Sequence, residues 1–175
     1  RQRQMCIRDR FITLVCVCLS MNSRAENLGF KGMLVIPTCS VNSGQAIDID
    51  WGDIEIQELE KRKPTHKIKK EINIECPYAI GQPKISLTGA RGPTPDTLST
   101  TKKNEGLNIM LRYGEEWNGA QVPNVNSEQI IYRGLNSISD SSKQLNLWAA
   151  LVAYQELSLL SPGPFSASAN LALRY

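Results

Sequence analysis

The 175-residue chain is long enough for one domain with a hydrophobic core, and its 41% hydrophobic and 21% charged residues are typical of a globular protein. The net charge of +3 depends on residues 1–25, which contain five Arg and one Asp, so the rest of the chain carries 15 basic and 16 acidic residues. This balance excludes a nucleic-acid-binding protein that relies on a basic surface.

Residues 11–25 read FITLVCVCLSMNSRA, which is typical of the apolar core and cleavage region of a secretory signal peptide. The apolar run is too short to span a bilayer, and Ser23 and Ala25 stand at positions −3 and −1 of a cleavage site. A buried strand is the alternative interpretation. Residues 1–10, RQRQMCIRDR, resemble an artefact of sequence assembly. We therefore expect the mature chain to begin at Glu26.

Two of the five cysteines lie in the predicted mature chain, Cys39 and Cys76. Export to an oxidising compartment favours a disulfide between them. The alternative is a pair of free, buried thiols.

Alternating apolar and polar residues predict about eight β-strands in the mature chain. The strand signals fall, in chain order, at residues 28–36, 46–51, 68–76, 85–87, 107–113, 129–133, 145–154 and 165–175. Residues 54–59 are predicted to form a short strand or a turn. Clusters of Gly, Pro, Asn and Ser separate these segments and predict turns.

Residues 144–160 also fit a helix, but their alternating Leu and Ala residues favour a strand. Short strands, polar turns and no convincing long helix indicate an all-β fold, specifically an antiparallel β-sandwich.

The last predicted strand has the clearest alternation. Its apolar side chains share one parity and stand at Phe165, Ala167, Ala169, Leu171, Leu173 and Tyr175. A strand of this length needs neighbours on both edges, because a free edge is a template for another chain. The pattern therefore raises the question of whether a second chain completes the sheet.

Candidates for catalysis are few. The only histidine, His66, lies in the basic run 61–70, which we interpret as a solvated loop leading into a strand. Neither a G-x-S-x-G elbow nor an H-E-x-x-H zinc motif is present. Adjacent Glu115 and Glu116 cannot flank a glycosidic bond from opposite sides. We therefore predict that the protein is not an enzyme.

A metal site has little support in the sequence. Asp48, Asp50 and Asp53 form a cluster that calcium could use, but alternation places Asp48 and Asp50 on the outer face of a strand. If the two cysteines are paired, zinc also lacks ligands. The prediction is that the protein needs no metal and no cofactor.

Four blocks of the sequence are similar to subunits of chaperone–usher pili, and most similar to the minor subunits of the P-pilus tip fibrillum. The blocks are ENLGFKGMLVIPTC (26–39), VNSGQAIDIDWGDIEI (41–56), INIECPY (72–78) and GPFSASANLALRY (163–175). Residues 90–145 match loosely. The resemblance covers nearly the whole mature chain, and the blocks are specific in combination.

The resemblance implies an incomplete immunoglobulin-like β-sandwich, that is, a pilin fold lacking its final strand. A hydrophobic groove beside the terminal strand would accept a strand from a periplasmic chaperone. At the outer-membrane usher, the N-terminal extension of a neighbouring subunit would replace that strand, which is a form of strand addition. The resemblance thus implies a homo- or heteropolymer and an extracellular fimbrium on the cell surface.

It also assigns roles to residues. Residues 26–32 would be the donor-strand extension, with Leu28, Phe30 and Gly32 on the face that enters a neighbour's groove, and 33–175 the pilin domain. The alternatives are an extension that pairs within its own sheet and a terminal strand at an ordinary edge. The apolar residues of 165–175 would border the groove and contact the chaperone or partner.

One departure concerns the end of the chain. The family usually carries Tyr at the penultimate position and Gly fourteenth from the end, whereas Tyr175 is last and Gly163 is thirteenth. The expectation is that one C-terminal residue is missing.

The prediction is a structural subunit of the tip region that supports cell adhesion. A sugar-binding adhesin is the alternative, with Trp117 and Asn118 as a candidate sugar site, although about 150 mature residues leave no room for a separate receptor domain. A rod-terminating subunit would lack the donor pattern of residues 28–32.

Overall fold

The computed structural model describes residues 28–175. Within them, Val35–Tyr175 form one compact unit, and residues 28–34 belong to a separate unit. No helix in the described part is long and apolar enough to cross a bilayer. The four helices of the compact unit are single 3₁₀ turns: η1 (Asn42–Gly44), η2 (Ile56–Glu58), η3 (Lys103–Glu105) and η4 (Leu157–Leu159).

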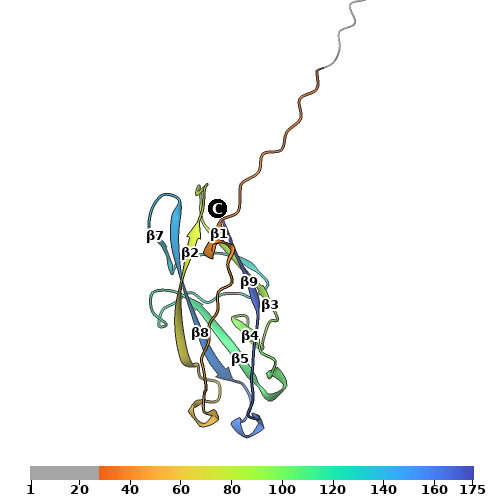
Figure 1. The fold of residues 1–175 in the computed structure, drawn as a ribbon, viewed down its shortest axis with the longest axis vertical. Coiled ribbons are helices and arrows are strands. Elements are labelled where there is room, and N and C mark those ends of the chain that lie inside the picture. Colours follow the sequence, from red (N-terminus) through yellow and green to blue (C-terminus); the bar gives the residue numbers. More distant parts are fainter. Residues whose placement is uncertain (1–27) are drawn as a thin grey trace, which may run out of the picture. The chain divides into compact units, whose positions relative to one another are not determined.

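Nine strands form two antiparallel sheets in the compact unit (Figure 1). The larger sheet has the order β1 (Ser40–Val41), β2 (Thr65–Glu75), β8 (Ser142–Ala153), β5 (Leu107–Tyr113) and β4 (Thr97–Ser99), and β7 (Leu135–Ser137) also pairs with β8. The smaller sheet has the order β6 (Glu128–Ile130), β3 (Lys84–Gly89) and β9 (Ala169–Arg174). The two sheets enclose one hydrophobic core.

Alternation along the strands decides which side chains enter that core. In β2, Ile72 and Ile74 are buried while their neighbours are exposed, and in β3 the same holds for Ile85 and Leu87, between exposed or half-buried residues. This is the period-2 pattern of strands with one face on a core. Ile68 shares the parity of Ile72 and Ile74 but is only half-buried and lies outside the core cluster.

The strand predicted within 144–160 is confirmed. β8 lies between β2 on one edge and β5 with β7 on the other. A position between two strands satisfies the main-chain groups on both edges, and it buries Leu145, Ala149 and Leu151 almost completely. The helical interpretation is therefore wrong except for the single turn of η4.

Apart from the strand predicted at 129–133, which the structure has at Glu128–Ile130, three predicted strands are absent or shortened. Residues 28–36 and 46–51 form no strand, and the terminal strand is paired only from Ala169 to Arg174 rather than from residue 165. The reason is the same in each case, since these segments have the right alternation but no neighbouring strand in the chain to bond with. Conversely, the short strands β1, β4 and β7 were missed because two or three residues are too few to show a period.

A disulfide joins Cys39 to Cys76, with 4.3 Å between their Cα atoms. The Cys39 amide donates to the carbonyl of Leu173 in β9 (3.1 Å), and the Cys76 amide, just after β2, donates to the carbonyl of Ser141 (2.7 Å). The bond therefore ties the segment before β1 to both sheets at one end of the sandwich.

Removing this bond should lower stability substantially. The disulfide closes a loop of 37 residues, and restricting the unfolded chain to that extent contributes roughly 3–4 kcal/mol. We expect the double variant Cys39→Ala/Cys76→Ala to lose about that much free energy of unfolding in urea titrations followed by tryptophan fluorescence. Wild-type protein in a reducing buffer is the matched control and should show the same loss. A change below about 1 kcal/mol would contradict the chain-entropy argument.

Candidate functional site

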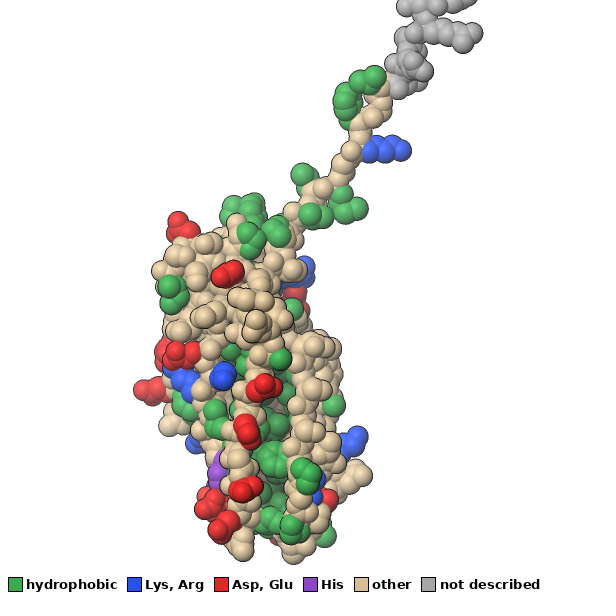
Figure 2. All heavy atoms as spheres, viewed as in Figure 1, with side chains coloured by type: hydrophobic (Ala, Val, Ile, Leu, Met, Phe, Trp, Pro, Cys, Tyr) green, Lys and Arg blue, Asp and Glu red, His purple; other side chains and the backbone are tan. Residues whose placement is uncertain are grey.

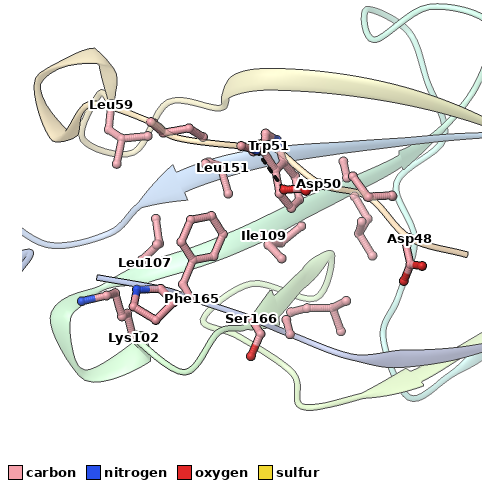
Figure 3. A pocket seen from close by; sticks show the side chains of 18 of the residues that line it. Asp48, Asp50, Trp51, Leu59, Lys102, Leu107, Ile109, Leu151, Phe165 and Ser166 are labelled. Carbon is pink, nitrogen blue, oxygen red and sulfur yellow. Dashed lines mark hydrogen bonds between the residues drawn. The ribbon is translucent and has the colours of Figure 1, made fainter. Parts of the chain in front are cut away.

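A long groove runs between two chain segments that lie side by side without pairing. We call residues 47–59 the first wall and residues 161–171 the second wall. The space between them has a volume of about 1190 Å³. Figure 2 shows it as a strip of hydrophobic side chains between two ridges, and Figure 3 shows the side chains that line it.

The floor of the groove is the hydrophobic core itself. Its side chains come from strands of both sheets and are nearly all aliphatic: Ile72, Leu87, Leu98, Leu107, Ile109, Leu111, Leu147, Ala149 and Leu151. The groove is therefore a place where one side of the sandwich is not covered by a strand.

Both walls alternate between apolar residues toward the groove and polar residues toward solvent. In the first wall, Ile47, Ile49 and Trp51 are half-buried, while Asp48 and Asp50 are exposed. The sequence predicted this orientation of the two aspartates.

The second wall repeats the pattern. Phe165 and Ala167 are half-buried against the core, while Ser166 and Ser168 are exposed. Residues 47–51 and 165–168 therefore alternate in burial as strands do, although neither segment belongs to a sheet.

The main chain of the walls lacks strand partners across the groove. Residues 46–55 take part in no strand pairing, and the amide of Gly52 donates to Asp50 Oδ1 (2.9 Å) in a local turn. Strand β9 pairs with β3 along one edge, and on its other edge the Leu173 carbonyl accepts one hydrogen bond, from Cys39. Two free edges that face each other are a template for one added strand.

Side-chain and main-chain contacts hold the two walls in place. Trp51 Nε1 donates to the carbonyl of His66 in β2 (2.7 Å), at an irregularity of that strand where His66 has a φ of +49°. The amide of Thr101 donates to the carbonyl of Ser166 (2.9 Å) in the second wall. The rings of Trp51 and Phe165 meet with centroids 6.1 Å apart, so the walls touch at this level of the groove.

The structure divides the predicted residues of the terminal strand into two groups. Phe165, Ala167, Ala169 and Leu171 line the groove. Leu173 is 1% exposed in the core, and Tyr175 packs half-buried against the core. Neither Leu173 nor Tyr175 lines the groove.

Sequence reasoning missed the first wall as part of the site. Ile47, Ile49 and Trp51 carry the same alternation as the terminal strand, and that signal was interpreted as an ordinary paired strand. Only the fold shows that the two alternating segments face one space.

The predicted donor residues lie in the separate unit 28–34. Leu28 and Phe30 are exposed by 78% and 87%, and no atom lies near the space that a side chain on Gly32 would take. These residues are in extended coil with apolar side chains open to solvent.

The candidate sugar site at Trp117 gains no support. Its ring packs edge-on against Trp148, with centroids 6.4 Å apart. The ammonium group of Lys67 and the guanidinium of Arg112 lie 5.1 and 5.5 Å from its centroid. Packing and cation–π contacts account for this residue without a ligand.

Glu115 is held as an ionised carboxylate. Hydrogen bonds from Asn136 and Lys69 lower the pKa of its carboxyl group, whereas a glycosidase acid needs a raised pKa. Among residues 28–175, no group of three or more His, Cys, Asp or Glu side chains is placed to hold a metal ion.

The open groove should make floor residues less costly to truncate than enclosed ones. We expect Ile74→Ala, which leaves a closed cavity, to cost about 3 kcal/mol of unfolding free energy. Ile109→Ala should cost at least 1 kcal/mol less, because its cavity is continuous with the groove. Urea titrations of the two variants test this, and equal losses would mean that the groove is closed over Ile109.

A family model described as "Fimbrial protein" matches residues 28–175. The chain is 30% identical over 155 residues to fimbrial protein PrsE of Escherichia coli, covering 86% of each chain, and 25% identical over 169 residues to the fimbrial adapter PapF of the same organism, covering 94% of this chain and 96% of PapF. Among solved structures it resembles the P pilus adaptor subunit PapF (TM-score 0.54, 23% identity, 81% of this chain and 98% of that chain). It also resembles the P pilus rod subunit PapA (TM-score 0.58, 23% identity, 78% and 98%).

These pilin structures have the incomplete immunoglobulin-like fold, so the fold class predicted from the sequence is confirmed. The extent of the family match and the similarity to PrsE and PapF also confirm the resemblance found in the sequence. The chain belongs to the fimbrial protein family and is a minor subunit of the chaperone–usher type.

Proposed function

We propose that this chain is a structural subunit of the tip region of a fimbria, that it polymerises by donor-strand exchange, and that it supports cell adhesion. The observation that carries the proposal is the groove between two walls that do not pair with each other, whose floor consists of core side chains with no strand over them. The similarity to a fimbrial adapter supports a position between other subunits.

One inserted strand would satisfy both free edges and cover the floor. Its main-chain groups would bond to residues of the first wall on one side and of the second wall on the other. Its alternate apolar side chains would replace water over the floor residues. In this proposal a periplasmic chaperone supplies the first such strand, and the extension of a neighbouring subunit replaces it at the outer-membrane usher.

The extension of the chain itself fits the donor role. Leu28 and Phe30 share one parity and are largely exposed, and transferring both to an apolar groove contributes about 4 kcal/mol. Gly32 continues that parity with no side chain, which suits a shallow part of a groove. Extension 26–32 and domain 33–175 would then serve different neighbours, and the assembled subunit would lie on the cell surface after passing through the periplasm.

Loss of the donor face should stop polymerisation without harming the groove. We expect Leu28→Asp/Phe30→Asp, or deletion of residues 26–32, to abolish the growth of oligomers from purified chaperone–subunit complexes, as measured by light scattering. Chaperone binding should stay intact, because it uses the groove. The matched control is Gly29→Ser, which changes the opposite face of the extension and should polymerise normally. If the variants lost chaperone binding as well as polymerisation, residues 26–32 would be part of the folded domain and not a donor strand.

The groove itself can be tested with a synthetic strand. Refolding the chain with an excess of a peptide that copies residues 26–36 should raise its melting temperature by several degrees, because the filled sandwich is more stable. A peptide with Leu28 and Phe30 replaced by Asp is the control and should have no effect. A chain that is monomeric, fully folded and indifferent to both peptides would contradict the incomplete sandwich.

A further inference from the structure

The two walls of the groove differ in charge. The first wall carries a row of five exposed carboxylates, Asp48, Asp50, Asp53, Glu55 and Glu58, and contains no Lys or Arg. The second wall contains no charged residue at all. Figure 2 shows acidic side chains along one ridge of the groove, and Figure 3 places Asp48 and Asp50 on the first wall.

Glu58 lies 3.0 Å from His66 Nε2, but the other four carboxylates, Asp48, Asp50, Asp53 and Glu55, are not neutralised by the protein. None of them takes part in the ion pairs of the described residues. Lys102 is the only Lys or Arg among the groove-lining residues of the described chain. Its ammonium group pairs with Glu105 and donates to the carbonyl and hydroxyl of Ser161 (2.7 and 2.9 Å).

A strand inserted beside the first wall would place its side chains in register with those of the wall. Its inward side chains would lie on the floor, and its outward side chains would lie about 5 Å from those of Asp48 and Asp50, measured between Cβ atoms. At that spacing opposite charges attract and like charges repel. The apolar floor accepts any strand with the right inward residues, so the outward positions are where charge can select among strands.

We infer that the groove selects the extension of another fimbrial subunit that presents at least two Lys or Arg side chains on its outward face. This inference rests on the proposed donor-strand mechanism and specifies the partner. The extension of this chain meets the requirement only in part, since its outward residues include Gly29 and a single cation, Lys31. The groove should therefore prefer a different subunit to a second copy of this chain.

Peptides based on the extension of this chain test the inference with the inward face held constant. The probes copy residues 26–36, either unchanged or with Gly29→Lys, Gly29→Glu or Lys31→Glu. Their dissociation constants are measured by fluorescence anisotropy against the full chain in 50 mM NaCl. Comparison of Gly29→Lys with Gly29→Glu is the decisive one, because both replace glycine by a long side chain.

We expect the Gly29→Lys peptide to bind about tenfold more tightly than the Gly29→Glu peptide, and Lys31→Glu to weaken binding by several-fold. In 0.5 M NaCl the difference should shrink toward twofold, because salt screens exposed charges. On the acceptor side, Asp48→Asn/Asp50→Asn should remove most of the preference. The matched control, Glu116→Gln/Asp140→Asn, removes two exposed carboxylates outside the groove and should preserve it.

Each other outcome has a definite meaning. Equal affinity for the Lys and Glu peptides, or a preference that survives Asp48→Asn/Asp50→Asn, overturns the charge selection and leaves the donor-strand mechanism standing. An unchanged peptide that binds as tightly as Gly29→Lys overturns the preference for a different subunit. Failure of every peptide to bind overturns the proposed function together with this inference.

Discussion

One constraint governs the structure. The free main-chain edges of the two walls and the core side chains between them lack a strand, and the described chain provides none at this place. The walls keep apolar faces toward a floor of aliphatic side chains, and their facing edges lack partners. Hydrogen-bonding groups beside an apolar surface are costly to leave unsatisfied, and so is apolar surface in contact with water. A single extended strand would bond to the free main-chain groups and also cover the apolar surface. An irregular loop would only cover the apolar surface.

The rest of the fold keeps this unfilled site in shape. β8 is paired on both edges, so the larger sheet is continuous beneath the groove. The Trp51–His66 and Thr101–Ser166 hydrogen bonds anchor each wall to its neighbouring structure, and the Cys39–Cys76 bond closes one end of the sandwich. In the proposed mechanism an incoming strand would therefore meet preformed edges, and less of its binding energy would be spent on ordering the groove.

The sequence predicted well which side of a segment points inward, but it predicted poorly which strand that segment pairs with. Alternation correctly predicted that Ile47 and Ile49 point inward and Asp48 outward, yet it equally predicted a paired strand, because the period is the same whether the neighbour belongs to this chain or to another. For the same reason Leu173 looked like Leu171, although the segment at Cys39, which bonds to the Leu173 carbonyl, lies beside Leu173, and Leu173 is buried in the core. The packing of Trp117 depends on Lys67, Arg112 and Trp148, which come from separate parts of the chain, so no local pattern reveals it.

The two faces of an inserted strand would carry different parts of recognition. Burial of apolar side chains is non-directional, so the floor would bind any strand whose inward residues fit its volume. Such a floor gives affinity but little discrimination among subunits that all share the alternating design. Discrimination needs an interaction that turns unfavourable for the wrong partner, and like charges facing each other across neighbouring strands provide one. The exposed carboxylates of the first wall, set beside an uncharged second wall, place that interaction where it leaves the buried face of the fold unchanged.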